Sequence, residues 1–119
     1  MDKKFYITTP IYYPSAKPHM GHAYSSIIAD FFARFKRMDG FDVQFLTGTD
    51  EHGLKIQRSA EKQNIDPLEF CNQISQTFRE LSKTLNLTNT DFIRTTENRH
   101  KKTVQHLWNQ LEKNDDIYL

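Results

Sequence analysis

The sequence is poor in cysteine. It has one cysteine, Cys71, so an intrachain disulfide and a Cys₄ zinc site within the chain are both excluded. Apolar residues follow this cysteine at spacings of three and four, which places the thiol on the apolar stripe of a helix; they are Ile74, Phe78, Leu81 and Leu85. We therefore expect Cys71 to be packed in the core rather than to be a reactive thiol.

Long hydrophobic runs and a strong net charge are also missing. No apolar run approaches the roughly 20 residues of a membrane span, and no signal-peptide pattern is found. The net charge of +1 gives no general field for nucleic acid. The basic clusters Lys3–Lys4 and Arg99–Lys102 could touch RNA, but a solvated helix face explains them better. We expect a soluble, cytoplasmic protein that binds neither membrane nor DNA.

The residues that are present suit a packed domain with alternating strands and helices. Hydrophobic residues make up 37% of the chain, including nine Phe and five Tyr, which argues against disorder. No repeat, low-complexity tract or Gly/Ser linker divides the chain, so 119 residues suit one domain or part of one. The predicted strands are 5–9, 43–47 and 92–94. The predicted helices are 20–38, 54–62 and 67–85, the last of these with Asp66 as its N-cap. A final helix is marked by Val104, Leu107, Trp108 and Leu111.

This alternation predicts an α/β fold, with a parallel sheet, helices on its faces and right-handed crossovers. The middle strand is mostly apolar and is expected to be buried on both faces. The large apolar residues of the first helix are expected to face the core; they are Tyr24, Ile27, Ile28, Phe31, Phe32 and Phe35.

Two histidines, His19 and His22, mark the start of the first predicted helix, directly after a strand and a loop. A helix N-terminus offers unpaired N–H groups and the positive end of the macrodipole, and imidazoles can donate further hydrogen bonds to a phosphate. Gly21, without a Cβ, lets a flat base approach the backbone. The pattern indicates a nucleotide site. A solvent-exposed turn, or a metal pair completed by Asp50 and His52, are the alternatives.

Asp50 directly follows the second predicted strand, where an ionised carboxylate is costly unless a cation or several donors meet it. A substrate ammonium would meet that need, whereas Asp50 or Thr49 could instead cap the helix near Leu54. His52 could orient its neighbours or line a pocket. Because ligands lie beyond the carboxyl ends of parallel strands, this segment and the histidine motif are expected to share one crevice.

Several segments together resemble the start of a class I methionyl-tRNA synthetase. They are Thr9-Pro10-Ile11-Tyr12-Tyr13-Pro14, the H-x-G-H form at His19–His22, Gly48-Thr49-Asp50-Glu51-His52-Gly53 and Arg94-Thr95-Thr96-Glu97, and the resemblance covers Lys4 to Leu119. It implies that residues 1–119 are the N-terminal half of a Rossmann-like catalytic domain, ending near the family's connective insertion. The family's K-M-S-K-S loop and cysteine-rich zinc insertion are not in these residues, so we expect an incomplete portion of the ligase. This chain alone is expected to be inactive, with any zinc held elsewhere.

The resemblance also implies residue roles. ATP with Mg²⁺, methionine and tRNA(Met) would be the substrates of the full-length enzyme. In similar synthetases the residues matching His19 and His22 contact the triphosphate and stabilise the transition state of adenylate formation, beside Gly21.

For methionine, the resemblance implies that Asp50 binds the amino group and that Ile11 offers its backbone carbonyl to it. Pro10 and Tyr13 would wall the thioether pocket. For Ile11 and Tyr13, packing as ordinary core residues is an equally good explanation. Two other functions stay open, namely another H-x-G-H nucleotidyltransferase and a non-catalytic fragment that binds nucleotide or metal.

Overall fold

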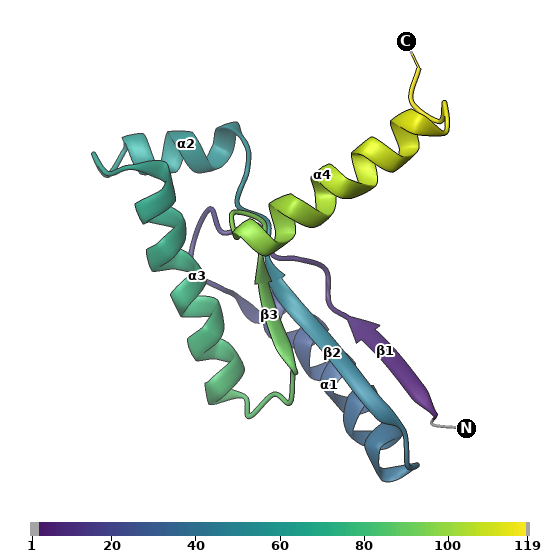
Figure 1. Ribbon diagram of the computed structural model, residues 1–119. Helices are drawn as coiled ribbons and strands as arrows, with labels where there is room; N and C mark the ends of the chain where they lie inside the picture. Colours follow the sequence, from purple (N-terminus) through teal and green to yellow (C-terminus); the bar gives the residue numbers. More distant parts are fainter. Residues whose placement is uncertain (1–2, 119) are drawn as a thin grey trace.

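A computed structural model describes residues 3–118, so Met1, Asp2 and Leu119 of the predicted 1–119 domain lie outside the described residues. The elements follow the predicted alternation (Figure 1): β1 (Lys4–Thr8), α1 (Met20–Met38), β2 (Asp42–Thr49), α2 (Leu54–Glu61), α3 (Pro67–Thr84), β3 (Asp91–Arg94) and α4 (Asn98–Lys113). Where bounds were predicted, the ends differ by no more than two residues. Asp66 caps α3 as predicted, because its carboxylate accepts from the N–H groups of Leu68 and Glu69.

The three strands form a parallel sheet in the order β1-β2-β3. Phe5 pairs with Val43 and Ile7 with Phe45 between β1 and β2, whereas Thr47 pairs with Phe92 between β2 and β3. The predicted fold class, an α/β fold with a parallel sheet and flanking helices, is confirmed.

Both crossover helices lie on the same face of this sheet. Ala29 and Ala33 of α1 pack against Val43 and Phe45. Phe92 shares their face, because its partner Thr47 alternates with them along β2. In turn, Phe92 packs against Phe78 of α3. The strand order β1-β2-β3 runs in one direction across the sheet. Crossover connections of the same handedness then place both helices on the same face.

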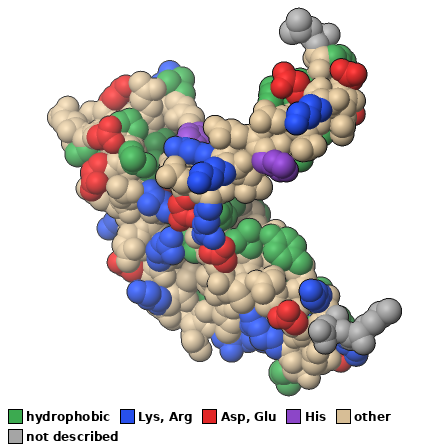
Figure 2. All heavy atoms as spheres, viewed as in Figure 1, with side chains coloured by type: hydrophobic (Ala, Val, Ile, Leu, Met, Phe, Trp, Pro, Cys, Tyr) green, Lys and Arg blue, Asp and Glu red, His purple; other side chains and the backbone are tan. Residues whose placement is uncertain are grey.

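The other face of the sheet is open among the described residues. Tyr6 of β1 is 64% exposed there, and Asp42 and Gln44 of β2 are exposed as well. Figure 2 shows a hydrophobic patch on this face near β1, and Figure 1 shows α1 behind the sheet. The expectation of a middle strand buried on both faces was therefore wrong.

Helix α1 turns its small residues toward the sheet, not its large ones. Its buried residues are Ala23, Ser26, Ala29, Asp30 and Ala33. Tyr24 is 68% exposed and Phe31 64% exposed, and the other four large residues predicted to face the core (Ile27, Ile28, Phe32 and Phe35) are exposed too. That prediction was wrong because a stripe of small residues lets the helix approach the sheet closely, whereas size alone does not say which stripe is buried.

Helix α4 extends away from the sheet (Figure 1), and none of its described residues is buried. At its base Arg99 pairs with Asp91 and Glu97, and Figure 2 shows acidic and basic side chains gathered where α4 leaves the body. Lys101 and Lys102 are exposed, as the interpretation of a solvated helix face requires. Among residues 3–118, every helix falls short of the length and apolar character needed to cross a bilayer.

Strands β2 and β3 approach each other very closely at Gly48. A Cβ placed on this residue would lie 2.0 Å from the carbonyl oxygen of Ile93 and 2.7 Å from its Cγ2. Such distances are far shorter than van der Waals contact, so only glycine fits. The close contact lies just before the Asp50–Gly53 segment and fixes the distance between the carboxyl ends of the two strands.

Candidate active site

The loop after β1 and the segment after β2 meet at the carboxyl ends of the strands. Tyr12 donates its N–H to the carbonyl of Gly48 at 2.8 Å, and Asp50 donates its N–H to the carbonyl of Tyr12 at 2.9 Å. Deeper in the sheet, the hydroxyls of Thr9 and Thr47 share a hydrogen bond of 2.7 Å. These bonds hold the histidine motif and the Asp50 segment beside one another, as the parallel topology predicts.

His19 and His22 cap α1 reciprocally. His19 is the N-cap, and its Nδ1 accepts the N–H of Gly21 at 3.0 Å. His22 is the third residue of the helix, and its Nδ1 accepts the N–H of His19 at 3.0 Å. An imidazole whose Nδ1 accepts a hydrogen bond carries its proton on Nε2 when neutral. Both rings therefore have Nε2–H groups free to donate.

Gly21 has a structural role beyond the one its sequence indicates. A Cβ at this position would lie 2.9 Å from Cε1 and 3.1 Å from Nδ1 of His19. The absence of a side chain thus lets the His19 ring fold back over the first turn of α1. Glycine here is required for the capping geometry, whether or not a base also approaches the backbone.

Aromatic rings surround His22. Its ring meets that of Tyr12 edge-on at a centroid distance of 4.9 Å and that of Phe78 at 5.1 Å. The Tyr12 hydroxyl donates to the carbonyl of His22 at 3.2 Å and shares a hydrogen bond of 2.8 Å with Ser26. Burial, and secondarily the neighbouring His19, hold the pKa of His22 below its usual value. His22 is thus a neutral donor near pH 7.

A pocket of about 360 Å³ opens beside the two histidines. Its lining combines them with two lysines and small or aromatic loop residues, namely Tyr13, Ser15, Ala16, Lys17 and Lys55. Within residues 3–118, no group of three or more His, Cys, Asp or Glu side chains is arranged to hold a metal ion. The metal-pair alternative therefore has no support from the geometry, whereas a cavity lined by imidazoles and ammonium groups suits an anion.

Asp50 does not cap α2. The N-cap of that helix is Gly53, with φ 127°, and it has no side-chain cap hydrogen bond. The hydroxyl of Thr49 donates instead to Glu51 at 2.8 Å. The capping alternative for Asp50 and Thr49 was therefore wrong. The carboxylate of Asp50 is partly buried and accepts no hydrogen bond from the described residues, which leaves it free to meet a cation.

Glu51 is the residue whose importance the sequence did not show. Its carboxylate is fully buried, and Arg94 binds it through Nε at 2.7 Å and Nη2 at 2.9 Å. The hydroxyls of Thr49 and Thr96 also donate to it. The acid thus joins the ends of β2 and β3. Arg94, the last residue of β3, and Thr96, just after that strand, were the available signal for such a pairing.

His52 and Cys71 complete this junction. The Nε2–H of His52 donates to the carbonyl of Thr95 at 3.3 Å, so the ring is oriented although it is exposed. Cys71 is buried among Ile56, Ala60 and Phe70, and burial raises the pKa of its thiol to about 11. The expected core role of Cys71 is confirmed.

The loop residues Pro10, Ile11 and Tyr13 have different environments. Pro10 is exposed and Ile11 is 41% exposed, so ordinary core packing does not explain either of them. Tyr13 is partly buried against the Ile56 and Cys71 cluster. Its hydroxyl lies 2.4 Å from where a Cβ of Gly53 would be, so the two motif segments touch at this point.

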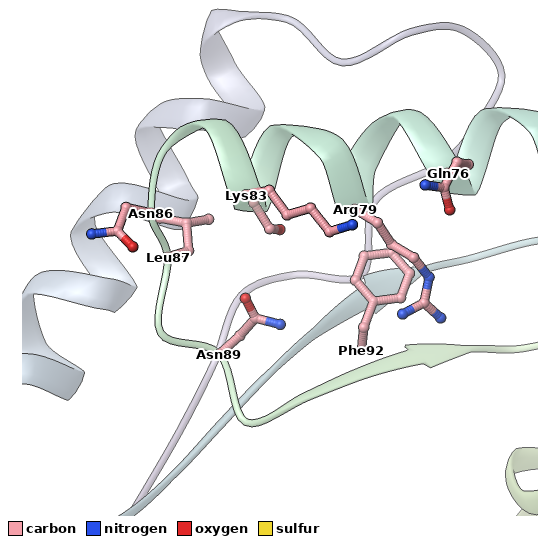
Figure 3. Close-up of a pocket in the computed structure, with 8 residues that line it drawn as sticks. Gln76, Arg79, Lys83, Asn86, Leu87, Asn89 and Phe92 are labelled. Atoms are coloured by element: carbon pink, nitrogen blue, oxygen red, sulfur yellow. The ribbon is translucent and has the colours of Figure 1, made fainter.

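A second cavity, of about 530 Å³, lies between α3 and β3 (Figure 3). Arg79 of α3 and Phe92 of β3 line it, with the guanidinium carbon 4.1 Å from the ring centroid. Arg79 also lies 3.9 Å from a carboxylate oxygen of Glu97. None of the predicted site residues lines this cavity.

The comparisons with known proteins agree with this geometry. A family model described as class I tRNA synthetases (M) matches residues 5–119. The methionine–tRNA ligase of Rickettsia conorii is 54% identical over 118 residues, which are 99% of this chain and 23% of that protein. The mitochondrial methionine–tRNA ligase of Takifugu rubripes is 54% identical over 117 residues, 98% of this chain and 20% of that protein. The chain thus spans about a fifth of these relatives' length.

Solved structures are similar too. A Mycobacterium tuberculosis methionyl-tRNA synthetase in complex with methionyl-adenylate superposes with a TM-score of 0.94 at 44% identity, covering 98% of this chain and 23% of that one. A leucyl-tRNA synthetase of Agrobacterium radiobacter, in a ternary complex with tRNA, gives a TM-score of 0.82 at 24% identity over 98% of this chain and 15% of that one. The second likeness shows a common fold alone.

Proposed function

Because this chain belongs to the class I tRNA synthetases of the methionine type, we propose that it forms the N-terminal half of the Rossmann-like catalytic domain of a methionine–tRNA ligase. The half would end near the family's connective insertion. The relatives that match nearly all of this chain carry that ligase name, and the chain matches about a fifth of their length.

The reaction of the full-length enzyme would have two steps. A carboxylate oxygen of methionine attacks the α-phosphorus of ATP, the bond from that phosphorus to the bridging oxygen breaks, and pyrophosphate leaves with the bond electrons. The methionyl group then passes to the terminal ribose of tRNA(Met). Mg²⁺ accompanies ATP as part of the substrate. Protein groups contribute mainly by positioning and by stabilising charge in such chemistry.

His19 and His22 are the proposed catalytic residues. Their Nε2–H groups would donate to phosphate oxygens as negative charge shifts toward pyrophosphate, with Gly21 beside them. The observation that carries the proposal is their reciprocal capping, because both Nδ1 atoms are already occupied by backbone N–H groups. Both rings are therefore preorganised donors, which is what transition-state stabilisation requires.

Asp50 is the proposed ligand of the methionine ammonium, and the free, partly buried carboxylate supports this role. The backbone carbonyl of Ile11 would accept from the same ammonium. Pro10, Tyr13 and His52 are proposed to line the pocket of the side chain. The Mycobacterium tuberculosis relative was solved with methionyl-adenylate, the intermediate that this arrangement would form.

Methionine-dependent exchange of pyrophosphate into ATP tests the proposal in the full-length enzyme. Exchange is expected with methionine and not with leucine as the matched control. Exchange that needs no methionine would favour another H-x-G-H nucleotidyltransferase. A complete lack of exchange would favour a non-catalytic nucleotide-binding protein. We expect the enzyme to act on tRNA(Met) in the cytoplasm.

A further inference from the structure

Two lysines from separate segments converge on the pocket beside His19 and His22. Lys17 lies in the loop between β1 and α1, and Lys55 lies in the first turn of α2. No carboxylate is among the residues that line the pocket. Its volume of about 360 Å³ falls within the usual range of ligand sites, about 300–1,000 Å³.

The two lysines bring positive charge to this pocket, beside the histidine donors. Each histidine accepts a backbone N–H at Nδ1, and a proton at that atom would break the cap. Their rings also lie 3.9 Å apart between centroids, where two cationic imidazoles would repel each other. The histidines therefore supply Nε2–H donors, and the ammonium groups of Lys17 and Lys55 supply positive charge.

Neither lysine is compensated by the described part of the chain. Within residues 3–118, no salt bridge involves Lys17 or Lys55. Lys55 stands near the N-terminus of α2, whose first turn has no acidic residue, and Lys17 stands just before that of α1. A cation near a helix N-terminus is unfavourable, because it faces the positive end of the macrodipole. An anion bound between the lysines would interact favourably with both ammonium groups and with both helix N-termini.

We propose that Lys17 and Lys55 bind the β- and γ-phosphates of ATP and retain them as pyrophosphate when the α-phosphorus is attacked. This inference rests on the proposed function of the site. The histidines then act nearest the reacting phosphorus, and the two lysines neutralise the leaving group. Ser15 lines the same pocket and can offer its hydroxyl to a phosphate oxygen.

Titration of the full-length enzyme with inorganic pyrophosphate tests this assignment by calorimetry. Lys17→Gln and Lys55→Gln are each expected to weaken pyrophosphate binding about tenfold, the effect of losing one charge-assisted hydrogen bond. Lys55→Arg should retain most of the affinity because it keeps the charge. Lys62→Gln, an exposed lysine outside the pocket lining, is the matched control and should leave binding unchanged. Methionine affinity should not change in any variant.

The outcomes separate this inference from the proposed function. If the unaltered enzyme binds pyrophosphate and both pocket variants behave like Lys62→Gln, the lysine assignment is wrong and the ligase proposal stands. If methionine-dependent exchange is absent while the lysine variants still weaken pyrophosphate binding, the ligase proposal is wrong and the lysine assignment stands. No binding of pyrophosphate by the unaltered enzyme overturns the assignment. Circular dichroism of each variant excludes misfolding, which is not expected at exposed positions.

Discussion

The guanidinium of Arg94 binds the carboxylate of Glu51 through two hydrogen bonds, and the acid has no solvent exposure. Hydrogen bonding to Glu51 is the main cause that raises the pKa of Arg94 above its usual value, so the guanidinium stays charged. Asp50 and His52, the proposed methionine ligands, flank the acid in sequence. The ion pair therefore fixes the backbone from which both of those side chains extend.

Removing the Glu51 charge should destabilise the protein strongly. In Glu51→Gln the guanidinium of Arg94 keeps its burial but loses its counterion, which typically costs about 3–5 kcal/mol. Urea unfolding followed by circular dichroism measures the loss. Glu80→Gln, at an exposed position of α3, is the control and should change the free energy of unfolding by less than about 0.5 kcal/mol. Equal losses in both variants would contradict a structural ion pair.

Replacement of His22 should affect chemistry more than substrate binding. We expect His22→Ala to lower methionine-dependent pyrophosphate exchange roughly 10²-fold or more in the full-length enzyme, because one preorganised donor is lost. Methionine binding should change less. His106→Ala, on the exposed surface of α4, is the control. An unchanged exchange rate in His22→Ala would remove this residue from catalysis.

Replacement of Asp50 should affect methionine selectively. Asp50→Asn keeps the size and much of the hydrogen bonding but loses the charge, so we expect methionine affinity to fall about tenfold, with little change for ATP. Equilibrium binding of each ligand to the full-length enzyme provides the measurement. Asp42→Asn, exposed at the start of β2, is the matched control. Equal losses for methionine and ATP would point to a folding effect instead.

Stability should fall in mild acid because of His22. Burial lowers the pKa of His22 in the folded protein, so the unfolded chain, with a pKa of about 6.5, binds more protons as the pH decreases. The contribution of His22 is therefore complete above about pH 6.5 and is lost as the pH falls through the lower, folded-state pKa. His22→Gln can retain the cap without titrating there. Its unfolding free energy should vary less with pH between 5 and 7, and an identical slope would refute the assignment.

The Cys71 thiol should be unreactive in the native protein. Its pKa of about 11 leaves little thiolate at pH 8, and the side chain is buried. Reaction with a disulfide reagent such as Ellman's reagent should be slow in buffer and fast in urea. The unfolded chain serves as the control for the same thiol. Rapid modification in buffer at pH 8 would show that the α2 and α3 packing opens readily.

Local signals in the sequence were sufficient for the elements and for the expectation that the two motif segments lie side by side. Asp66, Pro67 and Glu69 specify the start of α3 through short-range chemistry, and the histidine motif specifies the start of α1. Parallel topology then requires that the loops after β1 and β2 meet. The helix caps depend on interactions between residues a few positions apart, and the meeting of the two loops depends only on the strand order at one edge of the sheet.

Relations that depend on the whole fold were not predictable. The buried stripe of α1 consists mainly of small residues because the helix lies close to β2. The sequence of Met20–Met38 alone does not indicate which stripe faces the sheet. The pairing of Glu51 with Arg94 joins residues 43 positions apart. Asp50 was a plausible N-cap of α2 from the sequence, but the N-cap in the structure is Gly53, at φ 127°. In each case the tertiary neighbours decided the outcome.

The close approach at Gly48 has a genetic consequence. Every missense change at this codon adds at least a Cβ where the Ile93 carbonyl already lies, so β3 must move away from β2. That movement would carry Arg94 away from Glu51. A variant at Gly48 would consequently behave as a loss-of-function allele although the residue need touch no substrate, and compensating changes are expected in the β3 segment rather than around the pocket.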